Sequence, residues 1–284
     1  MKEIEPRRIL ITGCSSGIGR VCALGLARRG HQVIASVRNI ADVQALEQAG
    51  LAAVRLDLAD GTSIANGLEA ALALTGGRLD ALFNNGAFGL PGAVEDLTPE
   101  ALRAQFETNL FGWHDLTRRI IPLMRAQGSG RIIQNSSVLG LVALPFRGAY
   151  VASKFALEGL TDTLRLELAG SGIKVILIEP GPIESRFRGN ARTAFERYVD
   201  PTGSPHEEAY RRMAERLEQE GAVQPFTLPA EAVLKKLILA LEHPRPKPRY
   251  AVTLPTHLLG VLRRLLPTSA LDALLRKVSR GGRG

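Results

Sequence analysis

The stretch that decides the fold reads Arg8-Ile9-Leu10-Ile11-Thr12-Gly13-Cys14-Ser15-Ser16-Gly17-Ile18-Gly19. Its first part, residues 8–12, is a short apolar run that a glycine ends, which predicts a buried strand. Residues 17–29 have helical periodicity and stop at Gly30, a residue typical of the position after a helix C-terminus. The three glycines at 13, 17 and 19 therefore lie between a strand and a helix.

These glycines suit the binding of a nucleotide. Gly13 allows a tight turn, while Gly17 and Gly19 let the backbone and the helix approach a pyrophosphate, whose charge suits a helix N-terminus. A glycine-rich turn with no ligand is the alternative, and the strand–loop–helix context favours the nucleotide.

The same alternation continues along the chain. Further apolar runs predict strands at residues 32–37, 52–56, 81–84, 131–135, 174–179 and 249–254. Helical patterns lie between the first of these, at 41–49, 62–74, 98–125 with a bend at Pro122, and 149–169. The strands are apolar on both faces, as in a parallel sheet that helices cover. We therefore expect an α/β fold, a Rossmann-type doubly wound parallel sheet of about seven strands with helices on both faces.

The rhythm stops after Pro182. Residues 183–228 are polar and irregular with one helix near 205–220, and a helix is expected at 229–241. We expect residues 1–254 to form one catalytic domain in which the segment 183–228 covers the substrate. Residues 255–284 are then a basic, apolar tail with helices at 256–266 and 268–278.

Composition excludes several classes of protein. With 45% hydrophobic and 23% charged residues the chain reads as globular. The charged start has no signal-peptide pattern, and no apolar stretch reaches the ~18 residues of a membrane span. Cys14 and Cys22 form no CxxC pair and the histidines make no HExxH pattern, so neither a disulfide framework nor a metal site is expected. These features together indicate the cytoplasm.

The net charge of +8 is concentrated in the tail. Residues 243–284 hold nine Lys and Arg and one acid, so the remainder has 36 − 9 = 27 bases and 28 − 1 = 27 acids. An apolar and basic helical pair fits peripheral contact with an anionic membrane, and equally fits a helix pair that packs on the domain with solvated bases. Nucleic-acid binding is not expected, because the tail lacks interleaved aromatic residues.

The residue after the second strand bears on the choice of cofactor. An acid there would bind the ribose diol of NAD(H), whereas an arginine favours the 2′-phosphate of NADP(H). The chain has Val37 and then Arg38, so we expect NADP(H) rather than NAD(H), with Ser15 adding a hydroxyl. A solvated arginine after a strand is the alternative.

Tyr150 and Lys154 lie four residues apart on one predicted helix face. A free tyrosine has a pKa near ~10, and a nearby cation lowers it toward the range useful for acid–base work. Most such pairs are surface pairs. Here Ser137 stands 13 positions earlier, after a strand whose carboxyl end faces the ligand crevice, so its hydroxyl, the phenol and the glycine loop should meet.

Over residues 8–185 the chain resembles the short-chain dehydrogenases/reductases. The resemblance rests on an ordered set of motifs: Thr12–Gly19, Leu56–Leu58, Asn84–Gly86, Asn109 in Thr-Asn-Leu-Phe-Gly, Ser136–Ser137, Tyr150–Lys154 and Pro180–Gly181. Within the family it is most similar to the oestradiol 17β-dehydrogenase, retinol dehydrogenase and bacterial aldehyde reductase branch.

The resemblance implies roles for matching residues. Tyr150 would be the general acid or base, Lys154 would lower its pKa, Ser137 would bond the substrate oxygen and Asn109 would anchor a water, although an Asn bonding nearby backbone is the plainer interpretation. Asp57 would meet the adenine, with an Asx-turn as the alternative. The implied cofactor contacts are Gly13, Ser15, Ser16, Gly17, Ile18, Gly19, Arg38, Asp57, Leu58, Asn85, Gly86, Ala87, Tyr150, Lys154, Pro180, Gly181, Ile183 and Ser185.

The chain departs from the family pattern at two places. The usual Asn-Asn-Ala-Gly ends in Gly86-Ala87, so either Ala87 takes the glycine's conformation or the turn shifts. Ser185 replaces the usual threonine and keeps its hydroxyl.

The expected activity is hydride transfer between NADP(H) and a lipophilic aldehyde, ketone or alcohol. The substrate would meet apolar residues such as Leu90, Val138, Leu141, Phe146 and Phe187. Alternatives are a catalytically idle NADP(H) sensor and a 3-ketoacyl-carrier-protein reductase. The resemblance also implies a homodimer or homotetramer formed through the helices that hold Asn109 and Tyr150.

Overall fold

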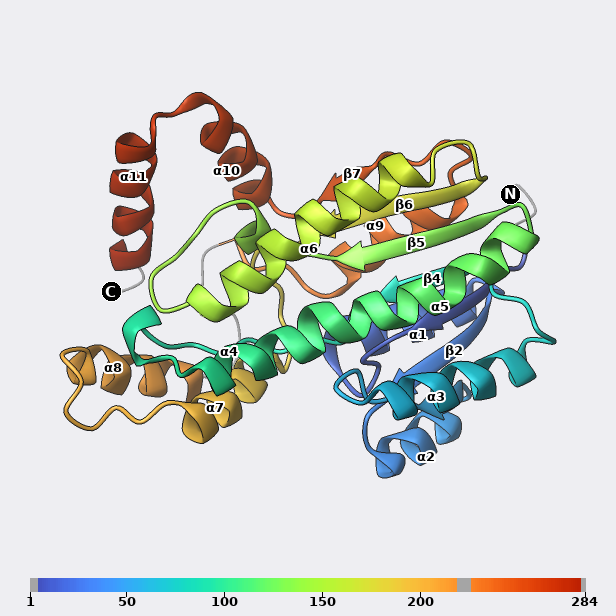
Figure 1. Ribbon diagram of the computed structural model, residues 1–284, viewed down its shortest axis with the longest axis horizontal. Coiled ribbons are helices and arrows are strands. Elements are labelled where there is room, and N and C mark those ends of the chain that lie inside the picture. Colours follow the sequence, from blue (N-terminus) through green and yellow to red (C-terminus); the bar gives the residue numbers. More distant parts are fainter. Residues whose placement is uncertain (1–4, 219–225, 282–284) are drawn as a thin grey trace.

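A single sheet of seven parallel strands organises the chain, in the order β3-β2-β1-β4-β5-β6-β7. The computed structural model describes residues 5–218 and 226–281 (Figure 1). The chain builds outward from β1 to β3, then crosses to β4 and builds toward β7, so the strand order reverses between β1 and β4. This confirms the doubly wound α/β prediction. The strands are β1 Arg8–Ile11, β2 Gln32–Val37, β3 Ala52–Arg55, β4 Ala81–Asn84, β5 Gly130–Asn135, β6 Ile173–Glu179 and β7 Arg249–Ala251.

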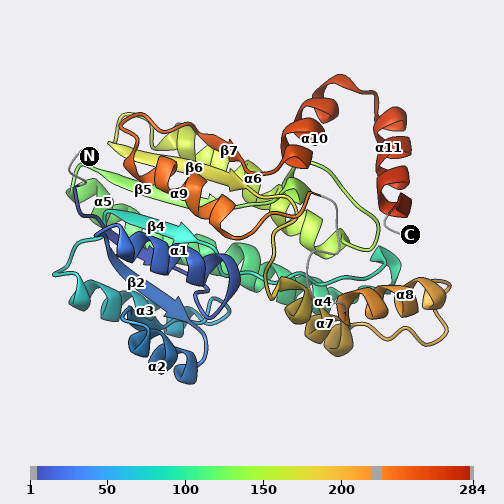
Figure 2. The same ribbon diagram turned by 180° about the vertical axis from the view of Figure 1, so that it is seen from behind.

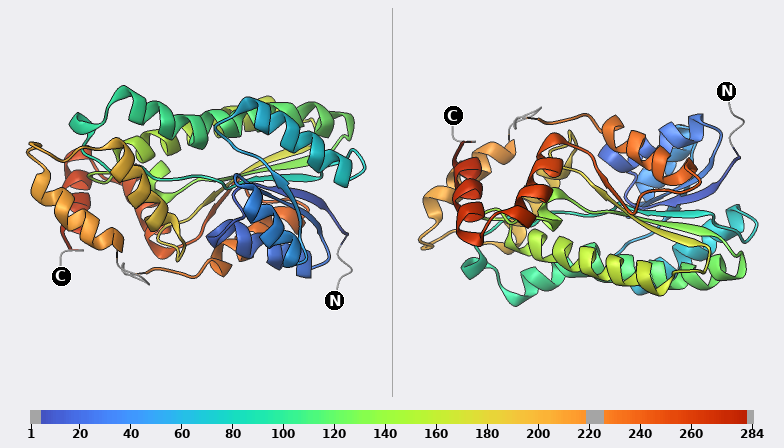
Figure 3. Two further views of the ribbon diagram at one scale, coloured as in Figure 1. Left: turned by 90° about the horizontal axis from the view of Figure 1, so that it is seen from below. Right: turned by 90° about the horizontal axis from the view of Figure 1, so that it is seen from above.

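Helices cover both faces of the sheet, as the three layers in Figure 3 show. One face carries α1 Gly17–Arg28, α2 Ile40–Gln48 and α9 Glu231–Glu242, which Figure 2 shows from behind. The other carries α3 Gly61–Leu74, α5 Gly112–Ala126 and α6 Gly148–Glu167. Each strand feeds both apolar cores, because neighbouring side chains alternate: Ile9 packs toward α1 and Leu10 toward α5.

The helix predicted over 98–125 is interrupted. Thr98 caps α4 (Pro99–Phe106) by accepting the N–H of Ala101 at 3.2 Å. A π-helical segment, η2 (Glu107–Phe111), then precedes α5, which continues through Pro122. The prediction was incomplete here, because a π segment keeps helical periodicity in the sequence and depends on contacts elsewhere; such segments often mark functional sites.

Within the described residues, the segment 183–228 contains more helix than predicted. The expected helix near 205–220 is present as α8 (Glu207–Glu218), but α7 (Phe187–Tyr198) was missed and the irregular prediction for it was wrong. Its high polarity hid a helical spacing of apolar residues, of which Ala191, Ala194 and Phe195 are buried.

Tyr210 anchors this covering segment to the loop after β4. Its hydroxyl accepts the N–H of Ala93 at 2.9 Å and donates to Asp96, at the end of the 3₁₀ turn η1 (Val94–Asp96). Ser204 also donates to Asp96, at 2.7 Å. The helices α7 and α8 are therefore held over the carboxyl ends of the strands (Figure 1).

The tail begins inside the domain. The last strand ends earlier than predicted, and α10 (Leu254–Leu265) starts before residue 256. Thr253 and Thr256 are buried beside Gly181. The second tail helix is α11 (Thr268–Gly281), and both lie at the same end of the molecule as α8 (Figure 2). Within the described ranges, no helix has the length and apolarity needed to cross a membrane.

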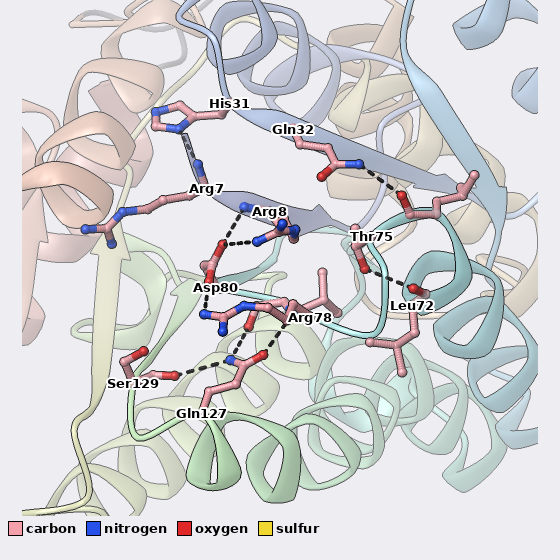
Figure 4. A network of polar contacts seen from close by, with 12 residues as sticks. Arg7, Arg8, His31, Gln32, Leu72, Thr75, Arg78, Asp80, Gln127 and Ser129 are labelled. Carbon is pink, nitrogen blue, oxygen red and sulfur yellow. Dashed lines mark hydrogen bonds and ion pairs between the residues drawn. The ribbon is translucent and has the colours of Figure 1, made fainter. Parts of the chain in front are cut away.

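Polar contacts join the loops at the opposite end, around the amino ends of β1 and β2 (Figure 4). Asp80 accepts the N–H of Arg8 at 2.8 Å, and Gln127 bonds the backbone N–H and C=O of Leu79 at 3.3 and 3.0 Å. These bonds join the side chains of Asp80 and Gln127 to backbone groups of neighbouring segments, so they hold the loops at this end together.

Candidate active site

The loops after β1, β4 and β5 are tied together at the carboxyl edge of the sheet. The Thr12 hydroxyl accepts the N–H groups of Asn85 at 2.8 Å and Gly86 at 3.0 Å. The Asn85 amide donates to the Thr12 carbonyl at 3.0 Å and accepts from Asn135 at 2.9 Å. These bonds place the glycine loop beside the end of β5.

Glycine is required in this loop because other backbone atoms lie too close for a side chain. Gly13 has a φ of +69°, and a Cβ there would lie 2.4 Å from the Cα of Gly86. A Cβ on Gly19 would lie 2.2 Å from the Gly13 carbonyl oxygen. Gly17 has a φ of +54° and faces Ser185. The tight turn that the sequence predicted at Gly13 is present, and the approach of Gly17 and Gly19 to a pyrophosphate stays a prediction.

The start of α1 fits an anionic group. Its N-cap residue, Ser16, makes no capping bond with its side chain, and the first turn has no acidic residue. Its backbone N–H groups and helix dipole are therefore available to a phosphate. Beside it lies a cleft of about 660 Å³, lined by Ser15, Ser16, Gly17, Arg20, Asp42, Ala45, Ser185 and Arg186.

Four of these lining residues, Arg20, Asp42, Ala45 and Arg186, were not predicted. Arg20 follows Gly19 directly and Arg186 follows Ser185 directly, so their positions next to predicted contacts were the available signal. The predicted Arg38 lies just past β2 with an exposed side chain, outside this lining. Its carbonyl accepts a bond from Arg55 at 3.2 Å.

The Gly86-Ala87 reversal needs no left-handed alanine. Among the described non-glycine residues only Phe146 and Phe226 have a positive φ, so Ala87 does not take that conformation. A Cβ on Gly86 would lie 2.9 Å from a methyl carbon of Leu58 and 3.2 Å from the Gly13 nitrogen. Leu58 thus fills the space that an alanine at 86 would need, and Ala87 packs its own methyl into the core on the α5 side.

Asp57 forms the Asx-turn that was the alternative interpretation. Its carboxylate accepts the N–H of Ala59 at 3.0 Å, and its own N–H donates to Ser63 at 3.0 Å. A contact between Asp57 and an adenine stays a prediction.

Tyr150 lies in the first turn of α6 and is 9% exposed. Burial raises the pKa of Tyr150 to about 12, and a hydrogen bond with Ser137 opposes this rise. The Ser137 hydroxyl also accepts the N–H of Leu139 at 3.1 Å. The Phe187 ring packs edge-on against Tyr150 at 5.3 Å between centroids. Phenol and serine hydroxyl therefore meet, as the sequence predicted, under an aromatic cover.

Lys154 is buried one turn further along α6. Its ammonium donates to the Asn135 carbonyl at 2.8 Å and lies 4.3 Å from the centroid of Trp113 and 5.7 Å from that of Tyr150. Burial lowers the pKa of Lys154 to about 7, and the charge of Glu158 opposes this. The lysine lies beside the phenol ring, but the Tyr150 pKa is raised by burial and Lys154 is not among the groups that lower it, so the lowered pKa expected from the sequence is not found.

Asn109 lies in the π-helical segment and is fully buried. Its amide accepts the N–H of Phe88 at 3.1 Å and donates to the Phe88 carbonyl at 2.8 Å. It also lies 3.4 Å from the hydroxyl of Ser153, which donates to the Tyr150 carbonyl. This matches the plainer interpretation of backbone bonding, and connects Asn109 to the helix of Tyr150.

The segment after β6 closes the site from the other side. The Pro180 carbonyl accepts the N–H of Val138 at 2.7 Å, Gly181 packs on Thr253, and Ile183 pairs with Leu228. The Ser185 hydroxyl accepts the N–H of Phe187 at 3.3 Å. Of the other aromatic residues in the covering segment, Phe195 is buried in the core of α7 and α8 while Phe226 is 59% exposed.

Known proteins were compared with the chain. The sequence profile of short chain dehydrogenases matches residues 7–195. An uncharacterized oxidoreductase, YbbO, from Escherichia coli is 42% identical over 274 residues, covering 96% of each chain. The human 17-beta-hydroxysteroid dehydrogenase type 1 is 34% identical over 260 residues, covering 86% of this chain and 77% of its own.

A solved structure agrees at the level of the fold. A short chain dehydrogenase/reductase from Burkholderia phymatum, in complex with NAD, has a TM-score of 0.76 and 26% identity, over 93% of this chain and 94% of its own.

Proposed function

This chain belongs to the short-chain dehydrogenase family, and from that premise we propose that it transfers a hydride between NADP(H) and a lipophilic aldehyde, ketone or alcohol. The membership makes it an oxidoreductase that acts on CH–OH donors. The observation that carries the proposal is the buried group of Tyr150, Ser137 and Lys154 beside the glycine loop.

The residues around the loop fit a dinucleotide, which would supply or accept the hydride. Its phosphates would meet Ser15, Ser16 and the N–H groups of α1, and its adenine Asp57 and Leu58. The nicotinamide end would meet Asn85, Gly86, Ala87, Lys154, Pro180, Gly181, Ile183 and Ser185.

The preference for NADP(H) rests on charge. Arg38 stands where an acid would select NAD(H), and Arg20 and Arg186 add positive charge beside the α1 terminus. The structure of the Burkholderia protein contains NAD and gives no support for NADP(H). The preference for the 2′-phosphate of NADP(H) therefore rests on the arginines of this chain.

Tyr150 would carry the proton. With a pKa raised to about 12 it holds its proton at neutral pH and can donate it to a carbonyl oxygen during reduction. In oxidation the phenolate form of Tyr150 would accept the alcohol proton, and the charge of the nearby Lys154 ammonium would favour that form. Ser137 would hold the substrate oxygen, and Asn109 would position α6 through Ser153.

A lipophilic substrate is supported by the apolar residues around Tyr150. Phe187 covers its ring, and Leu90, Val138, Leu141 and Val142 come from the adjoining loops. The relative named for 17-beta-hydroxysteroids suggests the same class. An idle sensor is less well supported, because all four expected catalytic residues are present. A carrier-protein reductase has no specific support among the described contacts.

The proposal is tested by Tyr150→Phe with a panel of lipophilic aldehydes and alcohols, using NADPH and NADH in parallel. Removing the acid should lower kcat by roughly 100- to 10,000-fold. Binding of NADPH, followed by fluorescence, should stay near the wild-type value. Normal turnover by the variant would refute the assignment of Tyr150, and no turnover by the wild type despite tight NADPH binding would favour the sensor.

We also propose a cytoplasmic enzyme that lies on membranes through its tail. On α10 an exposed apolar stripe is formed by Leu254, Leu258, Val261 and Leu265, each more than half exposed. At ~100° per residue these four fall within an arc of about 60°, opposite Arg263, which contacts the Leu141 carbonyl and the Phe155 ring. The exposed bases of the tail helices, Arg264, Arg276 and Lys277, give this surface the charge that anionic lipids attract.

A homodimer or homotetramer remains part of the proposal. Phe111 at the end of η2 and Leu160 and Leu166 on α6 are large, exposed and apolar, which suits a contact between copies through these helices. Light scattering of the purified chain measures the mass, and a monomer would remove this part.

A further inference from the structure

Three arginines, Arg131, Arg249 and Arg147, have partly buried guanidinium groups, and the first two have conventional partners. Arg131 donates to the carbonyls of Ala240 at 2.5 Å and His243 at 2.9 Å, at the C-terminus of α9. Arg249 pairs with the carboxylates of Glu158, Glu179 and Asp162. Both satisfy the rule that a buried cation is matched by acceptors.

The third, Arg147, is not matched. Burial lowers its pKa to about 10, with repulsion from Arg216 adding to the effect. Its hydrogen-bond partner is the Met213 sulfur at 3.7 Å, and a thioether is a weak acceptor. Among residues 5–218 and 226–281, no carboxylate forms an ion pair with it. The residue is nevertheless partly exposed, so a ligand can reach it from solvent.

Arg147 lies close in the chain to Tyr150, the proposed acid–base residue. It is the N-cap residue of α6 and precedes Tyr150 by three residues, which is ~5 Å along a helix axis. Its backbone pairs with Gly92, after β4, and its side chain meets α8. Phe146, next to it, has a φ of +59° and packs on His206 and Tyr210. Arg147 thus links the helix of Tyr150 to α8, whereas the glycine loop faces Ser185.

An uncompensated cation in such a place is unfavourable, because its lost hydration is not replaced. A bound carboxylate would replace it with a charge-assisted and, for arginine, bidentate pair. We propose that Arg147 binds the carboxylate of an amphiphilic substrate, an apolar chain with an acid at one end and the reacting carbonyl, at Tyr150, at the other. This subsite rests on the proposed function and names its substrate class.

The test compares ω-oxododecanoic acid with its methyl ester as aldehyde substrates of NADPH-dependent reduction. Wild type should have the higher kcat/KM for the acid. Arg147→Met should lower kcat/KM for the acid by roughly 10- to 100-fold and leave the ester nearly unchanged. Arg147→Lys, which keeps the charge, should retain part of the preference. Arg211→Met, an exposed α8 arginine paired with Glu208, is the matched control and should keep all of it.

Equal kcat/KM values for acid and ester in wild type, or an acid preference kept by Arg147→Met, would overturn the subsite.

A second readout is independent of turnover. Laurate should raise the Tm of wild type and of Arg211→Met, but not that of Arg147→Met, and methyl laurate should raise none of them through this site. Without ligand Arg147→Met should melt no lower than wild type, since it removes an unpaired charge; a large loss of Tm would mean a structural arginine and would also overturn the subsite. Laurate stabilisation without any aldehyde reduction would remove the proposed function and keep the subsite.

Discussion

At the residue scale, a few side chains bear on the proposed choice of NADP(H) over NAD(H). Arg38 follows β2 with an exposed side chain, while Arg20 and Arg186 line the cleft at the α1 terminus. A guanidinium can bond a 2′-phosphate, and it loses that bond when the phosphate is absent. The three arginines therefore offer two locations for selectivity, the end of β2 and the cleft.

We predict that Arg38→Ala raises the KM for NADPH roughly 10- to 100-fold and changes the KM for NADH little, because a charge-assisted bond to the phosphate is lost. Steady-state kinetics with both cofactors measures the ratio. Arg20→Ala and Arg186→Ala are the comparison variants. If Arg38→Ala left the ratio of the two KM values unchanged and Arg20→Ala or Arg186→Ala changed it, the selectivity would be assigned to the cleft instead.

At the scale of elements, an ion cluster joins the helix of Tyr150 to the sheet. Arg249 on β7 reaches Glu158 and Asp162 on α6 and Glu179 on β6. Glu158 and Glu179 are buried, and Glu158 lies one turn after Lys154. Burial raises the pKa of Glu158, while Arg249 opposes the rise. The cluster holds the carboxyl edge of β6 and β7 against α6, so it supports the site from behind.

Arg249→Met should destabilise the fold by about 3–5 kcal/mol, since it leaves buried carboxylates without a cation. The sign of the pH dependence follows. The folded pKa of Glu158 would rise further above its unfolded value, so folding would favour the protonated form and the deficit would grow as pH rises. Denaturant unfolding at about pH 5 and about pH 8 should show the larger deficit at the higher pH.

The matched control is Arg165→Met, which removes a partly exposed partner of the same Asp162. Such a pair contributes only ~0–1 kcal/mol. An equal loss in both variants, or a deficit in Arg249→Met that shrinks as pH rises, would contradict the role given to the cluster.

At the scale of the whole molecule, the position of the apolar and basic tail helices bears on the proposed membrane contact. The tail helices extend from the end of the molecule that carries α7 and α8 (Figure 1). Arg249, one of the nine bases of residues 243–284, is held in the ion cluster, so the charge free to meet a membrane is smaller than the sequence count. A tail on a membrane would place the substrate side near a store of lipophilic molecules.

We predict that vesicles rich in phosphatidylserine sediment the full chain and that Arg264→Glu and Leu258→Glu each weaken this binding. Each basic residue near such a surface contributes ~1 kcal/mol, so a charge reversal should lower the partition coefficient at least about fivefold. Lys174→Glu, at the opposite end of the sheet, is the control. Truncation after residue 243 would remove β7, so point variants are the cleaner test.

Failure of the full chain to sediment would remove the membrane proposal. If Leu258→Glu instead lowered the mass in solution, the stripe would be a contact between copies.

Local patterns in the sequence determined the doubly wound sheet, the glycine loop and the Tyr150–Lys154 pair. Each rests on neighbouring residues, through apolar periodicity, a turn that needs glycine, or a spacing of one helical turn. The position of Ser137 after a predicted strand indicated its hydroxyl, the resemblance to a known family added Asn109, and the structure brings both to the helix of Tyr150.

Tertiary structure alone decided the remaining features. A polar sequence hid α7, whose few apolar residues are buried against α8, the loop after β4 and the first turns of α4 and α6. The Gly86-Ala87 reversal is explained by Leu58, from the loop after β3. The environments of Arg186, Arg249 and Arg147 depend on segments far away in the chain. A side chain's partners, and hence its charge balance, are set by what the fold packs around it, and the absence of a partner for Arg147 becomes visible only there.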